Sequence, residues 1–232
     1  MINVVQISII IPASFELNKA ISLSAQISRL STQTNIKEII VVTSENVSIK
    51  NKNITSKKLS IISSAPQRAT AMNAGAKKAS GKILYFLHAD SHPPQDFDKL
   101  IIDSYKNGST SGCFRLRFDD KKLMLRFFTY FTLLPWYWVH YGDQSLYIDV
   151  KQFNQVGGFN ENLTTLEDID IVKRIKRMSN FRIIKTNIVT SARKYRKYGY
   201  YKVQMVFIVA VSMHLLGFKQ KYILKTLSII KK

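Results

Sequence analysis

Short apolar runs alternate with amphipathic stretches along the first 110 residues of the chain. Continuous apolar runs of this length are typical of strands buried on both faces of a sheet, whereas apolar positions three and four residues apart predict helices. Strands that alternate with helices predict a parallel, doubly wound sheet with right-handed crossovers. The predicted strands lie at residues 6–12, 37–43, 58–63 and 83–87, and the predicted helices at residues 16–30, 68–81 and 96–105.

The pattern changes after Gly108, where the regular alternation ends. The clearest later element is a helix whose apolar residues fall on one face. No repeat, linker or second core interrupts the chain, which favours one domain. The predicted elements are strands at residues 111–118, 144–150 and 181–186, a helix-like aromatic segment at 121–134, a turn at 157–159 and the clear helix at 167–178.

The predicted strand at residues 83–87 runs into His88-Ala89-Asp90 and then, after two residues, into Pro93-Pro94. In open α/β sheets, ligands bind at the edge where the carboxyl ends of the strands lie. A carboxylate at that edge is well placed to hold a divalent metal against a phosphate. An Asp90 that only caps the turn before the prolines explains the same residues about equally well.

Three acids in four residues, Glu167, Asp168 and Asp170, open the clear helix. Thr165 with Asp168, or Thr164 with Glu167, would form a capping box, and acids in a first turn complement the helix dipole. Three acids exceed what capping requires, so a general base among them is the second interpretation.

Three further segments carry weaker signals. Gly142-Asp143-Gln144 contains a common turn dipeptide. Arg68 opens a predicted helix, where it would either meet a phosphate at the helix N-terminus or lie free on the surface. Residues 193–198 interleave Arg and Lys with Tyr, which suits an anionic partner and a solvated surface equally well.

The composition narrows the class of protein. The chain has 232 residues, 46% hydrophobic and 22% charged, as in ordinary folded domains. Its single cysteine, Cys113, excludes an intrachain disulfide and favours a reducing compartment. The four histidines and the cysteine show no zinc-binding spacing. The apolar N-terminus has no positive charge before it, so we expect a first strand there and not a signal peptide.

Charge is distributed unevenly along the chain. All 15 Asp and Glu residues lie at or before Asp170, whereas the 62 residues after it hold 16 of the 35 Lys and Arg residues. This asymmetry predicts an anionic partner, such as phosphate groups, nucleic acid or lipid headgroups. A lysine-rich genome would explain the lysines but not the lack of acids. The apolar stretches at residues 127–141 and 203–218 are shorter than the roughly 20 residues that span a bilayer, so neither predicts a transmembrane helix.

Several segments, taken in order, resemble the family-two glycosyltransferases, which have the GT-A fold. The resemblance covers residues 4–200, and the order of the segments is more specific than any one of them. The strand end Leu87-His88-Ala89-Asp90, with Gly142-Asp143-Gln144, is most similar to a small bacterial subgroup of this family. The segments that carry the resemblance are residues 9–12 with Glu16, residues 38–42, residues 73–75 through Gly81, residues 86–90, residues 157–159 and Glu167-Asp168.

The resemblance implies roles for individual residues. Asp90 matches the last acid of the family's Asp-x-Asp element, which binds a divalent metal (Mn or Mg) and the donor diphosphate. Asp168 matches the acid that deprotonates the acceptor hydroxyl in inverting members, and Glu167 would help to hold the acceptor. The other implied donor contacts are Pro12, Glu16, Arg68 and Asn73, and the other implied acceptor contacts are Gly142, Asp143 and Gln144.

Some positions depart from the family pattern. His88 replaces the first Asp of the metal element, which weakens the set of metal ligands. Thr43-Ser44-Glu45 follows the second strand, where the family usually has an acid that contacts the base, and Phe15 replaces a common asparagine. The sequence lacks the Gln-x-x-Arg-Trp signature of processive members, so the resemblance implies a non-processive enzyme whose donor nucleotide stays open.

We therefore expect an inverting glycosyltransferase that uses a nucleotide-diphosphate sugar, with a mixed, mostly parallel sheet flanked by helices. Its catalytic domain would cover residues 1–198, with a nucleotide-binding half at about 1–110 and an acceptor half at 111–198. Basic amphipathic helices at residues 199–232 predict peripheral attachment to an anionic membrane on its cytoplasmic face, with nucleic acid the less favoured partner. The alternative for these helices is that they only pack on the catalytic domain.

Two other functions fit parts of the sequence. A catalytically silent, polybasic module would use the same fold to bind membranes or nucleic acid. The loss of the base-contacting acid favours that module, whereas the intact Asp90 and Asp168 favour the enzyme. A nucleotidyltransferase would share the sheet and the metal acid, but it would usually have a Gly-rich loop where this chain has Pro12-Ala13-Ser14-Phe15.

Overall fold

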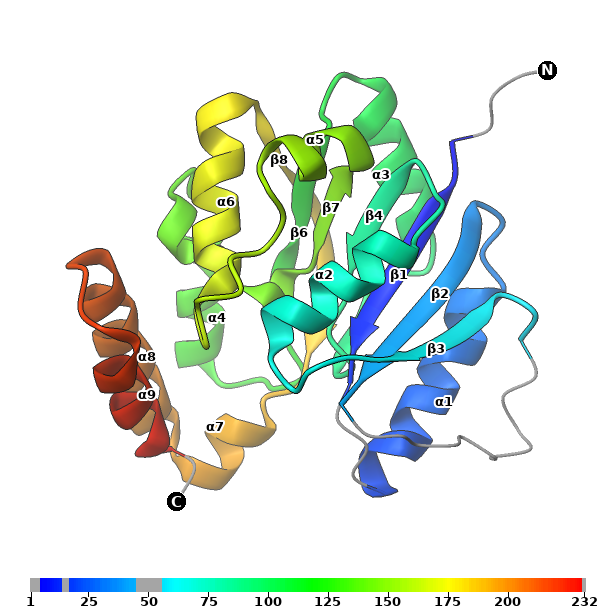
Figure 1. Cartoon of the computed structure of the whole chain (residues 1–232). Coiled ribbons are helices and arrows are strands. Elements are labelled where there is room, and N and C mark those ends of the chain that lie inside the picture. Colours follow the sequence, from blue (N-terminus) through cyan, green and yellow to red (C-terminus); the bar gives the residue numbers. More distant parts are fainter. Residues whose placement is uncertain (1–4, 14–16, 45–55, 231–232) are drawn as a thin grey trace.

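The computed structural model of the chain describes residues 5–13, 17–44 and 56–230, with residues 17–22 described by their backbone alone. Figure 1 shows a central sheet with helices on both faces and a helical hairpin at one side. The strands are β1 (Ile7–Pro12), β2 (Ile36–Thr43), β3 (Leu59–Ser63), β4 (Ile83–Phe86), β5 (Ser91–His92), β6 (Ser111–Phe118), β7 (Leu146–Asp149) and β8 (Phe181–Thr190). The helices are α1 (Leu17–Ser31), α2 (Arg68–Lys78), α3 (Phe97–Lys106), α4 (Leu123–Phe131), α5 (Val150–Gln155), α6 (Glu167–Met178), α7 (Arg193–Tyr198), α8 (Tyr200–Leu215) and α9 (Gln220–Ser228), with short 3-10 turns at Tyr137–Val139 and Gly142–Gln144.

The strands form one mixed sheet in the order β3-β2-β1-β4-β7-β6-β8-β5. Strands β1 to β4 are parallel to one another, as the alternating pattern predicts. Strand β7 is antiparallel to β4 and β6, and β6 is parallel to β8. The carboxyl ends of β4 and β6 therefore lie at the same edge of the sheet, which is where ligands of such sheets bind.

Two apolar cores cover the two faces of the sheet. On one face, α1 and α3 pack on the sheet, and Phe97 of α3 stacks on Tyr85 of β4 with ring centroids 5.4 Å apart. On the other face, α2, α5 and α6 pack around Phe86 and Phe153. Since β4 is covered on both sides, its continuous apolar run has the burial that the sequence predicts.

Gly81 corrects one prediction about α2. The sequence predicts this glycine as the cap of a helix at residues 68–81, but α2 ends at Lys78 and its C-cap is Ala79 in an extended conformation. A Cβ at Gly81 would lie 2.7 Å from the backbone nitrogen of Ser8. The glycine is therefore required by the close approach of two chain segments, not by a helix end.

The ends of three other elements also differ from the prediction. The helix predicted at residues 121–134 spans only Leu123–Phe131, and the strand predicted at residues 181–186 continues to Thr190. The strand predicted at residues 144–150 starts only at Leu146, because Gly142–Gln144 form a 3-10 turn before it.

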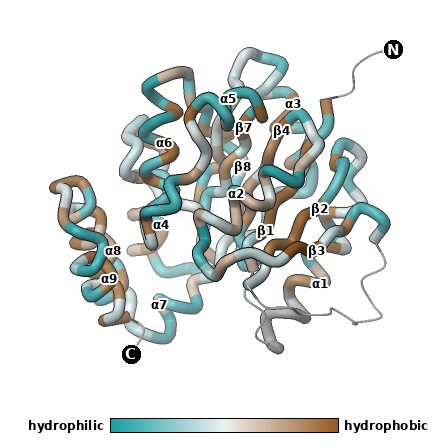
Figure 2. Tube along the Cα trace, in the orientation of Figure 1, coloured by the Kyte–Doolittle hydropathy of each residue, from teal (hydrophilic) through white to brown (hydrophobic). Residues whose placement is uncertain are grey.

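A third, smaller core joins α4, α7, α8 and α9. Leu125 of α4 and Tyr195 of α7 pack there with Val203 of α8 and Ile223 of α9. Figure 1 shows α8 and α9 side by side at one side of the sheet, and Figure 2 shows apolar and polar residues mixed along both. Tyr200 at the start of α8 donates a hydrogen bond to Asp120, which fastens this hairpin to the loop after β6.

The described helices include none that is both long enough and apolar enough to span a bilayer.

Candidate active site

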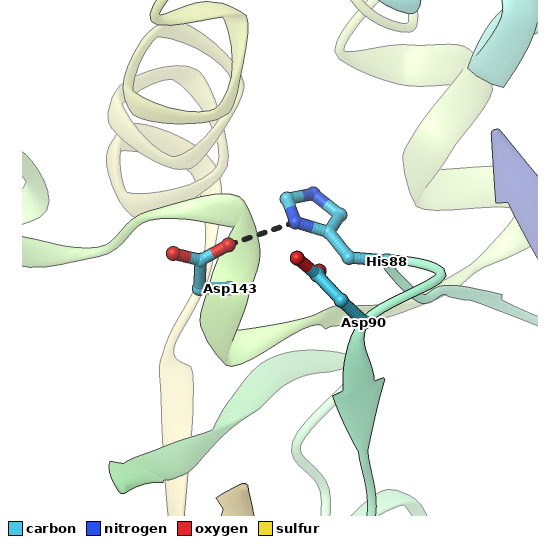
Figure 3. Close-up of side chains that lie close together, drawn as sticks. All are labelled: His88, Asp90 and Asp143. Atoms are coloured by element: carbon cyan, nitrogen blue, oxygen red, sulfur yellow. Dashed lines mark hydrogen bonds and ion pairs between the residues drawn. The ribbon is translucent and has the colours of Figure 1, made fainter. Parts of the chain in front are cut away.

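Two groups of charged side chains meet at the carboxyl end of β4. His88 and Asp90 follow this strand directly, and Asp143 reaches them from the turn between α4 and β7 (Figure 3). His88 Nδ1 lies 2.9 Å from Oδ1 of Asp143. One potential ligand atom from each of these three residues lies within 4.8 Å of the others. We call these three residues the metal cluster.

The second group consists of Arg68 at the start of α2 with Glu167 and Asp168 at the start of α6, and we call it the base cluster. Arg68 Nε lies 3.4 Å from Oε1 of Glu167, and an Arg68 amino group lies 3.4 Å from Oδ2 of Asp168. The same guanidinium lies 3.2 Å from Nδ1 of His88. Arg68 therefore connects the two clusters.

Gly142 lies between the metal cluster and the base cluster. A Cβ on this residue would collide with the carboxylate of Asp168 and with the imidazole of His88. Only glycine leaves room for both side chains at once. This contact gives a physical reason for the glycine in the Gly142-Asp143-Gln144 segment.

The backbone is strained beside both Asp143 and Glu167. Among the described residues other than glycine, only Ser145 (φ 60°) and Leu166 (φ 62°) have positive φ angles. Ser145 follows the Gly142–Gln144 turn, and Leu166 precedes Glu167. Non-glycine residues in such conformations cost about 1–3 kcal/mol and concentrate at functional sites.

The structure contradicts the capping interpretation of the acids in α6. Leu166 is the N-cap residue of this helix, and its side chain forms no capping hydrogen bond. Neither Thr164 nor Thr165 acts as the cap, so Glu167 and Asp168 are not held in a capping box. Instead, both acids face Arg68.

Electrostatics differ among the charged groups of the site. Burial and the charge of Asp168 raise the pKa of Glu167, although Arg68 partly offsets them. Partial burial would raise the pKa of Asp143, but its hydrogen bond to His88 and the charges of His88 and Arg68 lower it below its ordinary value. Partial burial would likewise lower the pKa of Arg68, but Asp168, Glu167 and Asp143 raise it.

Gln144 is fully buried and supports the turn that carries Asp143. Its side chain accepts a hydrogen bond from the Tyr141 backbone at 3.2 Å and donates one to the Phe114 carbonyl at 3.3 Å. Its neighbour His140 is also buried, and burial together with the charge of Lys176 lowers the pKa of His140 to about 3. A direct contact between Gln144 and an acceptor would therefore require this turn to move.

Asn73 holds the loop between α5 and α6. Its side-chain amide donates to the Phe159 carbonyl and accepts from the Phe159 backbone nitrogen, both at 2.9 Å. Gly158, with φ 67°, brings this loop close to Asn73. Arg174 fixes the same loop from α6 by donating to the Gly158 carbonyl at 2.7 Å. The predicted donor contact of Asn73 stays a prediction.

The remaining predicted donor contacts are Pro12 and Glu16. Pro12 ends β1, next to Val42 of β2. Glu16 lies outside the described residues, as do Phe15 and Glu45.

The metal cluster fits a divalent cation. One imidazole nitrogen and two carboxylates form a donor set that suits Mn²⁺ and, with less preference, Mg²⁺. At bond lengths of about 2.1 Å, ligands of such an ion lie at most about 4.2 Å apart. The candidate ligand atoms all lie within 4.8 Å of one another, so they need to move little to bind it. His88 Nδ1 donates a proton to Asp143 in one tautomer and offers its lone pair to a cation in the other.

Asp143 is the residue whose position the sequence did not reveal. It was predicted as an acceptor contact, yet its carboxylate lies beside His88 and Asp90. His88 stands where the family's metal element has its first acid. Asp143, which is 55 residues further along the chain, lies beside His88. The one sequence signal was the presence of Gly-Asp in a turn, which alone does not indicate a ligand.

The chain is similar to solved structures over nearly its whole length. No protein-family model and no curated protein matches it. A mannosyltransferase from Pyrobaculum calidifontis, solved with GDP-Man and Mn²⁺, is 15% identical with a TM-score of 0.64, over 97% of this chain and 69% of that one. S. aureus TarS 1-349, solved with UDP-GlcNAc, is 14% identical with a TM-score of 0.62, over 97% of this chain and 71% of that one.

These similarities, with the sheet order described above, define the fold class. The chain has the GT-A fold, with a mixed, mostly parallel sheet flanked by helices, as the sequence predicts. At 13–15% identity the similarity shows the fold alone.

Proposed function

We propose that the chain is a nucleotide-sugar-dependent glycosyltransferase of the family-two type that is inverting and non-processive. The observation that carries this proposal is the meeting of the metal cluster and the base cluster at Gly142. A transfer reaction needs both a cation site for the leaving diphosphate and a base for the acceptor, side by side. Solved structures of this fold that bind GDP-Man with Mn²⁺, or UDP-GlcNAc, support the donor class.

The donor would bind at the metal cluster. His88, Asp90 and Asp143 would hold a divalent ion, which would neutralise the negative charge that builds up on the diphosphate when it leaves. Asp90 is exposed and accessible to a diphosphate from solvent. Arg68 would add a permanent positive charge on the same side, because its guanidinium already lies against His88. Pro12, Glu16 and Asn73 are the further donor contacts that we propose from the family resemblance.

The acceptor would bind at the base cluster. Asp168 would take the proton from the acceptor hydroxyl while that oxygen bonds to the anomeric carbon and the bond to the diphosphate breaks. A single displacement of this kind inverts the configuration of the sugar. Glu167, whose pKa is raised by burial and by Asp168, would form a hydrogen bond with the acceptor. Arg68 would hold Asp168 in place.

The halves of the chain would then have separate tasks. Residues up to about 110 supply Arg68, His88 and Asp90, whereas residues 111–198 supply Asp143, Glu167 and Asp168. We propose that the first half binds the nucleotide and that the second half, including Gly142 and Gln144, binds the acceptor, with Gln144 acting by supporting its turn. Two residues cross this division: Asp143 joins the cation site of the donor, and Arg68 holds Asp168.

We also propose that residues 199–232 attach the enzyme peripherally to the anionic cytoplasmic face of a membrane. Tyr201, Met205 and Ile208 lie on one face of α8 with exposed fractions of 77%, 57% and 40%. Lys219 precedes α9, and Lys221 and Lys225 lie within it. The described residues after Asp170 include no acid. Apolar side chains flanked by basic ones favour a membrane interface, where each basic residue contributes about 1 kcal/mol near an anionic surface.

The membrane proposal is tested by sedimentation with anionic vesicles at low and high salt. The third core packs α8 and α9 against Leu125 and Tyr195, so point substitutions are cleaner than removal of the residues after Tyr198. We expect salt-sensitive binding by the full chain and loss of binding by a Met205→Gln/Ile208→Gln double variant. Full-length protein that ignores anionic vesicles at low salt would contradict the membrane proposal and favour a soluble acceptor.

The enzyme proposal is tested by thermal shift with UDP, GDP and their sugars, with and without Mn²⁺. A ligand that binds only the folded state stabilises it by about 2.7 kcal/mol at a hundred times its Kd. We expect one nucleotide to raise the Tm, and only when Mn²⁺ is present. No nucleotide-dependent shift, combined with vesicle or nucleic-acid binding, would favour the catalytically silent module instead.

A further inference from the structure

A separate cavity of about 450 Å³ lies between α4 and the adjoining ends of β6 and β8. Four basic side chains line it: Arg115, Arg117, Lys121 and Arg126. Arg115 and Arg117 are two residues apart on β6 and so project on the same side of the strand. Arg126 and Tyr130 lie four residues apart on α4, on one face of that helix.

The basic residues of this cavity lack acidic partners within the part of the chain that the structure describes. Among the described residues, no carboxylate forms an ion pair with any of these four side chains. Asp120 also lines the cavity, but its carboxylate is bound by Tyr200 at 2.7 Å and lies 3.4 Å from Arg196. Four like charges around one hollow repel one another, and an anion between them removes that cost.

The side chains that line the cavity suit a phosphoryl group. The guanidinium of Arg115 lies over the ring of Tyr130, 5.4 Å from its centroid, which fixes one basic group at the wall. Arginine forks bind phosphate oxygens in pairs and hold them more specifically than lysine does. Asn187, opposite Arg115 on β8, adds an amide to the lining.

The cavity lies close to the candidate active site. Thr190 of β8 pairs with Phe118 of β6 on one side and with Ser91 of β5 on the other. Phe118 lines the cavity, and Ser91 follows Asp90 directly. Two strand spacings, about 10 Å, thus separate the rim of the cavity from the chain at the metal cluster.

We propose that this cavity binds a phosphoryl group of the acceptor, so that the acceptor is a phosphorylated compound. This assignment rests on the proposed transferase function and names the acceptor class. This phosphoryl group of the acceptor is distinct from the donor diphosphate, which would bind at His88, Asp90 and Asp143.

The source of the phosphoryl group is either a water-soluble compound or a lipid headgroup. Leu123, Phe127 and Phe131 form an apolar stripe along α4, with exposed fractions of 76%, 60% and 38%. An acyl chain attached to the phosphate would contact that stripe. A soluble compound would use the basic residues alone.

The test measures binding of inorganic phosphate and of dihexanoyl phosphatidic acid by calorimetry in metal-free buffer. Three proteins are compared: wild type, the Arg117→Gln/Arg126→Gln variant, and the charge-matched control Lys151→Gln/Arg177→Gln on α5 and α6. All four substituted side chains are exposed, so we expect each protein to keep the wild-type Tm. Binding of UDP and GDP with Mn²⁺ is measured on the same three proteins.

We expect the cavity variant to bind phosphate about tenfold or more weakly than wild type, with the control unchanged. If wild type binds phosphatidic acid more tightly than phosphate, and the cavity variant does not, the phosphoryl group belongs to a lipid headgroup. If wild type binds both ligands equally well, it belongs to a soluble compound. The assignment would be overturned if wild type binds no phosphate, or if all three proteins bind phosphate equally well. If the cavity variant loses phosphate but wild type binds no nucleotide, the cavity stands as an anion site and the transferase proposal falls.

Discussion

The two acids of the metal cluster, Asp90 and Asp143, are more open to solvent than Glu167 and Asp168 on the other side of Gly142. The side chain of Asp143 is 44% exposed, whereas those of Glu167 and Asp168 are 3% and 19% exposed. An open group of ligands lets an ion and a diphosphate enter and leave together. A shielded carboxylate interacts more strongly with the atoms it faces, because water screens it less.

The two clusters also differ in how their positions are fixed. His88 and Asp90 follow a buried strand, so the sheet positions them directly. Glu167 and Asp168 depend on Leu166 in a left-handed conformation and on Arg68 from a different helix. This difference predicts that substitutions at the base cluster affect chemistry most, and that substitutions at the metal cluster affect donor binding most.

The largest effect is expected from Asp168→Asn. Loss of a general base typically costs about 10²–10⁴ in rate, measured here as release of nucleoside diphosphate from the nucleotide sugar. The Tm should change little, because Asp168 caps nothing and its partly exposed pair with Arg68 contributes at most about 1 kcal/mol.

Asp170→Asn is the matched control for that substitution. Asp170 lies in the same helix but pairs with Arg174 and does not contact Arg68. Its turnover should stay within a few-fold of wild type. Equal loss of turnover in both variants, or a large fall in the Tm of Asp168→Asn, would instead indicate a structural role for the first turn of α6.

The next effect is expected from Gly142→Ala. The new methyl group would push Asp168 and His88 apart, so both nucleotide binding and turnover should fall, at a stability cost of about 1–3 kcal/mol. Calorimetry with UDP or GDP and a thermal melt measure the two effects. Gly108→Ala strains a turn with open space around it and should leave nucleotide binding unchanged. Normal binding by Gly142→Ala would show that the clusters do not meet as described.

The sequence predicted the elements that depend on local pattern but not the contacts between them. The run at residues 83–87 and the periodicity at residues 167–178 predicted β4 and α6 almost to the residue. The meeting of Asp143 with His88 depends on β7 lying next to β4, a pairing of segments about 60 residues apart that no local pattern encodes. The predicted cap of α6 is wrong. Thr164 and Thr165 fit a capping motif in the sequence, but the N-cap position is occupied by Leu166 in a left-handed conformation.

A smaller effect is expected from Glu167→Gln. Burial and Asp168 raise the pKa of Glu167, so the folded protein binds more protons than the unfolded chain and loses stability as the pH rises through that pKa. The variant lacks this penalty, so its Tm should exceed that of wild type at about pH 8, and the difference should shrink towards about pH 4. Melts across that range measure it, and a variant less stable at high pH would contradict the assignment. We also expect weaker acceptor binding.

The most direct test of the account is Mn²⁺ binding followed by electron paramagnetic resonance, with and without UDP or GDP. Wild type should bind Mn²⁺, and more tightly when the nucleotide is present, whereas Asp90→Ala and Asp143→Ala should lose most of that binding. Asp96→Ala is the control, because it removes an exposed acid that pairs with Lys99 at the start of α3. Binding that is equal in wild type and in both site variants would contradict the claim that His88, Asp90 and Asp143 hold the cation on which donor binding depends.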